Sequence, residues 1–283
     1  MFKYNDSILK CPNCGESLIK DTNNKMFSCQ NNHCFDIAKQ GYINLLMSNQ
    51  IKGKIHGDSS EMLNARKNIL FGGYYKSISN LLVRTIKQEL KGKKENTSIL
   101  DLGCGIGYYL KEIKDSLDKT LINYYGIDIS KSGIVEACKL DKSINWVVGS
   151  TNKLPYLNNS VDILISIFSP ITLTECERVL KKDGLLFVIS PNQGHLIELK
   201  EIIYPNIILK REDRNELDSV SFIKINSSNL KEVISVKNAD LKSLLLMTPH
   251  YWKSSIKAKE ELYLLDSLDV SIDIELKTYK YKY

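Results

Sequence analysis

The hydrophobic positions after residue 97 follow two alternating patterns. Short, nearly continuous apolar runs are typical of buried parallel strands, and stretches with apolar residues three or four positions apart are typical of helices. The predicted strands are 98–102, 123–128, 144–148, 161–167 and 185–190, and the helices between them include 134–140 and 173–180. Strands and helices in alternation predict an α/β fold built on a parallel sheet.

The segments on either side of this unit are less regular. Upstream, the pattern predicts a short extended piece at 41–46 and helices at 62–70 and 78–90. The first helix is preceded by the capping sequence Asp58-Ser59-Ser60-Glu61. Downstream, it predicts helices at 195–203 and 238–247, strands at 220–225 and 231–235, and an alternating final strand at 270–278. This order predicts a Rossmann-like, seven-stranded sheet whose last strand is reversed.

The loop after the first strand of the unit carries the clearest chemical signal. The sequence Leu100-Asp101-Leu102-Gly103-Cys104-Gly105-Ile106-Gly107 ends an apolar strand in an acid and adds three alternating glycines. Such glycines permit a tight turn and the close approach of a nucleotide-like ligand. About twenty residues later the next strand ends in Asp128, where doubly wound folds bind ribose hydroxyls. The sequence therefore predicts a cofactor site at this loop.

The spacing of the glycines distinguishes between cofactors. A dinucleotide site uses G-x-G-x-x-G to hold a pyrophosphate, but this chain has G-x-G-x-G with Asp101 two residues before it. A carboxylate there would repel a pyrophosphate, and it suits the cationic amino group of S-adenosylmethionine, which carries no phosphate. We therefore expect a class I methyltransferase with its donor at Asp101, Gly103, Gly105, Gly107 and Asp128, rather than a glycine-rich turn without a ligand.

The first 34 residues hold four of the seven cysteines. In a reducing compartment such a cluster indicates a metal before disulfides, and structural zinc takes four nitrogen or sulfur ligands. Cys11, Cys14 and Cys29 supply three ligands, and either His33 or Cys34 supplies the fourth; free thiols are the alternative. We expect residues 1–38 to form a zinc-binding module, 39–95 a linker with helices that cover the cofactor site, and 96–283 the methyltransferase domain.

Composition and charge limit the class of protein and its partners. A chain of 283 residues with 43% hydrophobic and 25% charged residues is an ordinary globular protein. Its net charge of +6 is compatible with binding to nucleic acid without establishing it. No apolar run is long enough to span a bilayer and the N-terminus does not lead into a signal peptide, so we expect a cytoplasmic protein without a membrane partner.

Motifs along nearly the whole chain resemble the bacterial 23S rRNA (guanine-N1)-methyltransferases of the RlmA type. The resemblance rests on Cys11-Pro12-x-Cys14, Cys29-x-x-x-His33 and the segments 35–46, 57–62, 100–109, 167–170, 195–200 and 247–249. It implies a homodimer whose zinc module helps to grip a hairpin loop in domain II of 23S rRNA. It also implies that His33 is the fourth zinc ligand, and Cys34 is then a departure from the family pattern.

The resemblance also implies particular contacts with the cofactor. Carried over position by position, these contacts fall on Tyr75, on Gly105 and Ile106, and on His195. Tyr75 could instead cover apolar surface, and His195 could cap a helix or lie on the surface. The loop Phe168-Ser169-Pro170 follows the fourth strand, where this fold places its substrate base, although a plain strand-to-helix turn is the competing interpretation.

The sequence therefore favours transfer of a methyl group from S-adenosylmethionine to N1 of a guanine. The loop after the fourth strand offers Ser169 but no acid, so the sequence identifies no general base. One alternative is methyl transfer to a small molecule, with a zinc knuckle that mediates only protein contacts. Another is a non-catalytic rRNA-binding or ribosome-assembly protein, against which the intact acids Asp101 and Asp128 argue.

Overall fold

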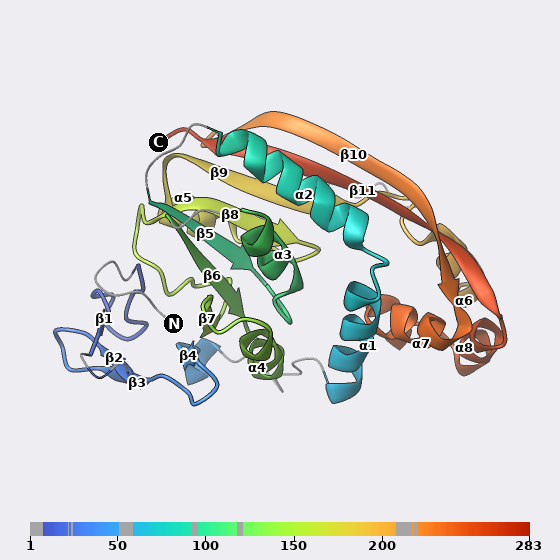
Figure 1. Ribbon diagram of the computed structural model, residues 1–283, viewed down its shortest axis with the longest axis horizontal. Coiled ribbons are helices and arrows are strands. Elements are labelled where there is room, and N and C mark those ends of the chain that lie inside the picture. The colour runs from blue at the N-terminus through green and yellow to red at the C-terminus, as the bar shows by residue number, and fades with distance from the viewer. Residues whose placement is uncertain are drawn as a thin grey trace.

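The computed structural model describes residues 8–21, 23, 25–50, 59–91, 96–117, 121–207, 217 and 220–283. Its main sheet has eight strands in the order β10-β11-β9-β8-β5-β6-β7-β4 (Figure 1). They are β4 (Tyr42–Asn44), β5 (Thr97–Leu102), β6 (Ile122–Asp128), β7 (Asn145–Val148), β8 (Val161–Ile167), β9 (Leu180–Pro191), β10 (Phe222–Lys237) and β11 (Ser267–Tyr281). The predicted fold class is confirmed.

The five strands predicted from the apolar runs form the parallel centre of the sheet, from β9 through β8, β5 and β6 to β7. β11 runs antiparallel between β9 and β10, which confirms the reversed last strand. The sheet has eight strands rather than seven because β4 pairs in parallel with β7 beyond the predicted edge. At three residues, β4 is too short for its sequence to show a periodic pattern.

Strand β10 corrects the prediction of two separate strands at 220–225 and 231–235. It is one strand of 16 residues, paired with β11 along its length apart from an irregularity between Lys224 and Asn226. The intervening polar residues remain in the ladder because β10 is an edge strand and most of its side chains are exposed. An exposed edge strand needs no continuous apolar face, so its polar middle does not read as a strand.

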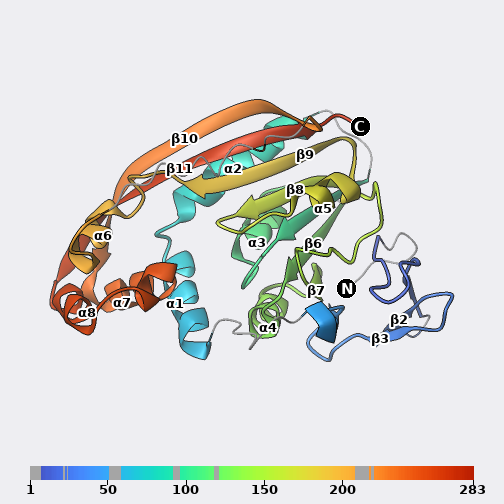
Figure 2. The same ribbon diagram turned by 180° about the vertical axis from the view of Figure 1, so that it is seen from behind.

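One core cluster joins a face of the sheet to α1 (Ser60–Phe71), α2 (Lys76–Glu89), α3 (Tyr108–Ser116), α4 (Lys131–Leu140), α6 (Ile197–Ile203), α7 (Asn238–Leu246) and α8 (Ile256–Tyr263). Helices α6, α7 and α8 lie together near α1 at the end of the long β10–β11 pair (Figures 1 and 2). Helix α1 begins after Ser59, whose hydroxyl accepts a hydrogen bond from Met62 N at 3.2 Å. Asp58 of the predicted cap lies outside the described residues. None of the described helices is long and apolar enough to cross a membrane.

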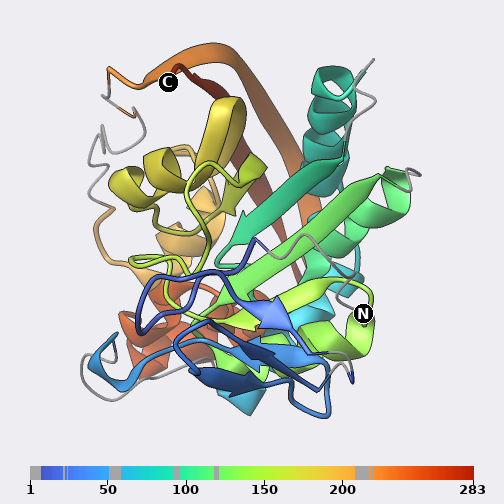
Figure 3. The same ribbon diagram turned by 90° about the vertical axis from the view of Figure 1, so that its left-hand side faces the viewer.

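The other face of the sheet is covered by α5 (Leu173–Val179) and by the N-terminal segment. This segment forms a small antiparallel sheet of β1 (Ile19–Lys20), β2 (Met26–Ser28) and β3 (Cys34–Asp36), drawn in blue and turned toward the viewer in Figure 3. Leu9, Leu18 and Phe27 share one hydrophobic core with Val147 and Tyr156. The cysteine-rich segment is therefore packed onto the sheet as one of its covering layers.

Two backbone hydrogen bonds fix the start of this segment to the loop after β7. Lys10 N donates to Pro155 O at 3.0 Å, and Leu157 N donates to Ile8 O at 2.8 Å. The chain then passes through β3 and directly into β4, which joins the main sheet. The segment thus contacts the rest of the molecule both through its core and through a strand.

Candidate active site and metal centre

The glycine loop between β5 and α3 is held against the end of β6 by backbone hydrogen bonds. The N–H groups of Gly103 and Cys104 both donate to Ile127 O, at 2.9 and 3.0 Å. Gly105 N donates to Asp128 Oδ2 at 2.8 Å, and Ser130 N donates to Asp128 Oδ1 at 2.7 Å. Asp128 therefore fixes two backbone segments while its carboxylate lies at the carboxyl end of its strand.

Two glycines of the loop are required by close packing as well as by a positive φ. A Cβ on Gly103, which has φ +72°, would lie 2.1 Å from Ser169 Oγ. A Cβ on Gly107, which has φ +80° and precedes α3, would lie 2.5 Å from the ring of Trp146. Gly103 thus lets the loop after β8 approach the glycine loop, and Gly107 lets α3 begin close to β7.

A cavity of about 370 Å³ opens above this loop, at the carboxyl ends of the parallel strands. Most of the residues predicted for the donor and substrate sites line it: Tyr75, Asp101, Gly103, Gly105, Ile106, Asp128, Phe168, Ser169 and Pro170. Two predicted donor residues, Gly107 and His195, are not among the lining residues. Gly107 ends the loop and packs against Trp146, and His195 lies behind Tyr75 and Phe168.

The remaining lining residues were not predicted from the sequence as donor-site residues. They are Arg66, Leu70, Cys104, Tyr108, Tyr109, Ile129, Ser130, Ser150, Thr151, Asn152, Ile167 and Met247. Residues 150–152 follow the predicted strand 144–148, so the rule that ligands bind at carboxyl ends of strands could have found them. Arg66 and Leu70 come from α1, which lies in the segment expected to cover the cofactor site, but no local signal singles out these two residues.

The cavity has an acidic floor that fits a cationic ligand. Asp101 is only 3% exposed, and burial, together with the charge of Asp128, raises the pKa of its carboxyl to about 7. Within the described chain, no ion pair or hydrogen bond joins the Asp101 side chain to a cation. A ligand with an ammonium and a sulfonium group would supply the missing positive charge, so these residues fit S-adenosylmethionine.

Tyr75 and Phe168 form an aromatic wall of the cavity, and His195 supports them from behind. His195 is 8% exposed, its ring stacks on Phe168 with centroids 5.6 Å apart, and its Nε2 lies 3.5 Å from Tyr75 Oη. Asp273 N donates to His195 Nδ1 at 3.3 Å, so the neutral ring carries its proton on Nε2 and donates to Tyr75. Burial lowers the pKa of His195 to about 4, which keeps the ring neutral.

The loop after β8 holds Phe168 in this aromatic wall in a strained backbone conformation. Phe168 has φ +52°, an unfavourable value for a residue with a side chain, and its ring is 40% exposed. Phe168 N donates to Ile189 O at 3.0 Å, and Ser166 Oγ donates to Ser169 O at 2.8 Å. These bonds hold the loop as a formed surface beside the donor cavity, where a flat substrate could stack.

The cysteine-rich segment brings four metal-binding side chains to one point. The ligand atoms of Cys11, Cys14, Cys29 and His33 all lie within 4.8 Å of one another. Cys14 Sγ is 3.6 Å from Cys29 Sγ, and His33 Nδ1 is 3.4 Å from Cys29 Sγ. Tetrahedral zinc with bonds of about 2.0–2.3 Å places its ligand atoms roughly 3.4–3.8 Å apart, so this donor set fits zinc.

Cys34, the other residue considered as the fourth ligand, lies outside this group. Its exposed thiol donates to Asn32 O at 3.6 Å, and it belongs to β3.

Within the cluster, the backbone N–H of Glu16 hydrogen-bonds to Cys14 and lowers the pKa of that thiol to about 6. A thiol that ionises readily is the form in which cysteine binds a metal.

Two family models match this chain, one over the metal cluster and one over the donor cavity. Residues 9–54 match a zinc-ribbon family model described as "RlmA, N-terminal", which spans the four-residue cluster. Residues 100–188 match a model described as "Methyltransferase domain", which spans the glycine loop, Asp128 and the loop after β8. Both predicted modules are therefore present in this chain.

Relatives along almost the full chain carry both parts. The chain is 29% identical over 278 residues to "Putative 23S rRNA (guanine-N(1)-)-methyltransferase YxjB" of Bacillus subtilis, covering 95% of this chain and 96% of that protein. It is 25% identical over 249 residues to "23S rRNA (guanine(748)-N(1))-methyltransferase" of Streptomyces fradiae, covering 86% of this chain and 85% of that protein. The similarity thus extends over both the ribbon and the cavity.

Proposed function

We propose that this chain is an S-adenosylmethionine-dependent methyltransferase of the RlmA type and that it methylates N1 of a guanine in 23S rRNA. The proposal rests on two observations taken together. This chain has both a donor cavity and a four-residue zinc cluster, and it is similar over most of its length to proteins named for methylation of guanine N1. The Streptomyces fradiae relative is named for guanine 748, and we take a domain II hairpin loop with that guanine as the substrate.

Residues of the cavity would hold the donor in a fixed orientation. When bound, S-adenosylmethionine supplies an electrophilic methyl group on its sulfonium sulfur. Asp101 would accept hydrogen bonds from the ammonium group, and Asp128 would accept them from the ribose hydroxyls. Gly103, Gly105, Ile106 and Tyr75 would line the donor site.

Gly107 and His195 act on this site indirectly in our proposal. Gly107 fixes the start of α3 against Trp146, and His195 holds the Tyr75 hydroxyl by donating to it from Nε2. The Tyr75 proton is then directed away from His195, since Tyr75 Oη accepts that hydrogen bond. Both residues position groups that line the cavity.

The loop after β8 is the acceptor site in this proposal. A guanine turned out of its hairpin stacks on Phe168, whose ring is exposed beside the donor cavity. Guanine N1 carries a proton at neutral pH, and Ser169 Oγ, close to Gly103, accepts a hydrogen bond from it. The chain aligns N1 with the donor and excludes water, which is the main source of rate in a displacement of this kind.

The zinc site has a structural role in this proposal. Cys11, Cys14, Cys29 and His33 fill all four positions of one zinc ion, which leaves none open for catalysis. The ribbon that the ion stabilises helps to grip the rRNA hairpin. We place the protein in the cytoplasm, where its rRNA substrate is made, and include the homodimer that the family resemblance implies.

Primer extension on 23S rRNA tests this function. In a strain that lacks the gene, the reverse-transcription stop at a domain II hairpin guanine should disappear, and purified protein with S-adenosylmethionine should restore it on the unmodified rRNA. A restored stop excludes a non-catalytic assembly protein. An unchanged stop in the deletion strain, with donor binding intact in the purified protein, would favour the small-molecule methyltransferase instead.

A further inference from the structure

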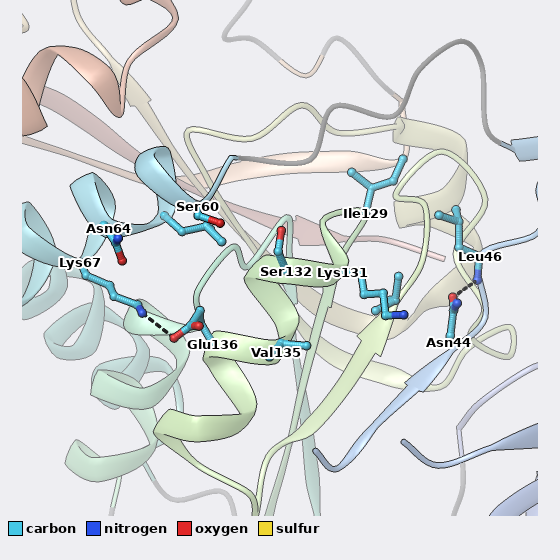
Figure 4. A pocket seen from close by; sticks show the side chains of 12 residues that line it. Asn44, Leu46, Ser60, Asn64, Lys67, Ile129, Lys131, Ser132, Val135 and Glu136 are labelled. Carbon is cyan, nitrogen blue, oxygen red and sulfur yellow. Dashed lines mark hydrogen bonds and ion pairs between the residues drawn. The ribbon is translucent and has the colours of Figure 1, made fainter. Parts of the chain in front are cut away.

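A second cavity, larger than the donor cavity, lies beside it. Its volume is about 710 Å³, and Figure 4 shows its walls: α1 on one side, β4 on the other and α4 between them. Ile129, which follows Asp128, lines both cavities, so the two adjoin at this side chain. Nothing in the methyl-donor site uses the second cavity, and its size is in the range of sites for small ligands.

This cavity exists because β4 extends the sheet. Asn44 is the last residue of β4, Val148 is the last of β7, and Ile129 comes directly after β6. All three line the cavity, and their strands are parallel neighbours. It therefore occupies the carboxyl edge of the sheet, where ligands bind in folds of this type, one strand further out than the donor.

The lining combines an apolar floor with hydrogen-bonding groups at the rim. Four apolar side chains are buried or half-buried and are called the floor here: Leu46, Leu63, Val135 and Val148. Ile129 is also apolar but exposed, and the polar lining residues, called the rim, are Asn44, Ser60, Asn64, Lys67, Lys131, Ser132 and Glu136. Leu46 N donates to Asn44 Oδ1 at 3.1 Å, so the Asn44 amide presents its NH₂ group to a ligand. A flat ring with polar edges matches such a surface.

The charges at the rim favour an anion. Glu136 is the one acid among the lining residues, and it is already paired with Lys67 at 2.5 Å and with Lys139 at 2.7 Å. Lys131 is exposed at the start of α4, and no acid in the described part of the chain forms an ion pair with it. The cavity therefore offers a cation that a phosphate group could satisfy.

We propose that this second cavity binds an unpaired nucleotide of the substrate RNA, separate from the guanine that receives the methyl group. The base lies on the apolar floor, the amides of Asn44 and Asn64 face its edges, and Lys131 contacts its phosphate. This inference rests on the proposed function, because it takes RNA as the substrate. Since β4 follows the ribbon directly, RNA held by the ribbon would reach this cavity next to the catalytic edge.

Two substitutions test the cavity by different means. Asn64→Trp fills it, because Asn64 is exposed, lines this cavity and does not line the donor cavity. Lys131→Glu reverses the free charge. The matched control is Lys182→Glu. Lys182 is exposed near the start of β9, so it lies at the amino end of a parallel strand and away from the carboxyl ends that line the cavity. For each full-length zinc-loaded protein, affinity for a domain II hairpin RNA is measured across salt concentrations, and affinity for S-adenosylmethionine by calorimetry.

We expect Asn64→Trp and Lys131→Glu each to weaken RNA binding by about tenfold or more, and Lys131→Glu to lower the salt slope by about one. Donor affinity should stay within about twofold in both, and Lys182→Glu should leave RNA affinity within about twofold. If the unmodified protein binds and methylates the hairpin while both cavity variants bind it equally well, this inference is wrong and the proposed function stands. If the unmodified protein neither binds nor methylates the RNA, the proposed function fails, and this inference fails with it.

Discussion

Asp101 is a buried carboxyl whose ionisation the fold itself opposes. Its pKa rises from an ordinary value of 3.8 to about 7, first because of burial and then because of the charge of Asp128. The folded apoprotein therefore binds more protons than the unfolded chain between these two pH values. The free energy of unfolding falls as pH rises through this window and reaches its lower level above pH 7. The acid costs stability at neutral pH, and its position in the cavity gives the reason for keeping it.

Replacement of this acid should stabilise the apoprotein and weaken donor binding. At pH 8 an ionised Asp101 costs on the order of 3–5 kcal/mol, so Asp101→Asn should raise the melting temperature there by several degrees. At pH 5, where Asp101 is largely protonated, the two proteins should melt at closer temperatures. Affinity for S-adenosylmethionine should fall by about tenfold or more. A lower melting temperature for Asp101→Asn at pH 8 would show that the carboxylate has a cationic partner in the apoprotein.

His195 shows what the sequence could and could not predict at this scale. Family resemblance predicted a contact with the cofactor, but the ring is buried behind Tyr75 and Phe168 and does not line the cavity. Its position depends on Asp273 in β11, far along the chain, which donates to Nδ1. The positions of the glycine loop and Asp128, by contrast, were predictable because they depend on local turns at the ends of predicted strands.

At the scale of elements, the zinc ribbon places two neighbouring residues, His33 and Cys34, in different positions relative to the metal cluster. His33 lies in the four-residue cluster, whereas the Cys34 thiol is exposed and donates to Asn32 O. His33→Ala should lose the zinc, about one ion per chain by elemental analysis, and lower the melting temperature, because a three-stranded ribbon of this size has little core of its own. Cys34→Ser is the matched control and should retain the zinc. If His33→Ala retained its zinc and Cys34→Ser lost it, Cys34 rather than His33 would be the fourth zinc ligand.

Elements with strong periodicity were predicted well, but the pairing of short or exposed ones was not. The extended piece expected at 41–46 contains β4, whose place in the main sheet its sequence does not show. The central strands have continuous buried apolar runs, so their existence and their direction followed from the pattern. Strand β4 has three residues, and the middle of β10 is exposed and polar, so both depend on pairing with distant strands. The second cavity was missed for the same reason, since β4 forms one of its walls.

Considered as a whole, the molecule has one sheet with the zinc ribbon as part of its covering layer. Leu9 and Phe27 share a core with Val147 and Tyr156, and Lys10 donates to Pro155 O. Removal of zinc with a chelator should therefore increase hydrogen exchange at the amides of β7 and residues 154–157, as well as in the ribbon. Amides of β9, on the far side of β8, serve as the internal reference. If the increase in hydrogen exchange were confined to residues 8–38, the ribbon would be an independent folding unit.

The place of β4 at the edge of the sheet has a consequence for how the protein behaves in the cell. β7 is buried along its whole length and pairs with β4 on its outer side. If the ribbon unfolds and β4 detaches, β7 becomes a bare apolar edge able to pair with another chain. During zinc starvation we therefore expect newly made protein to aggregate or be degraded, so that the supply of one metal ion sets how much soluble enzyme accumulates.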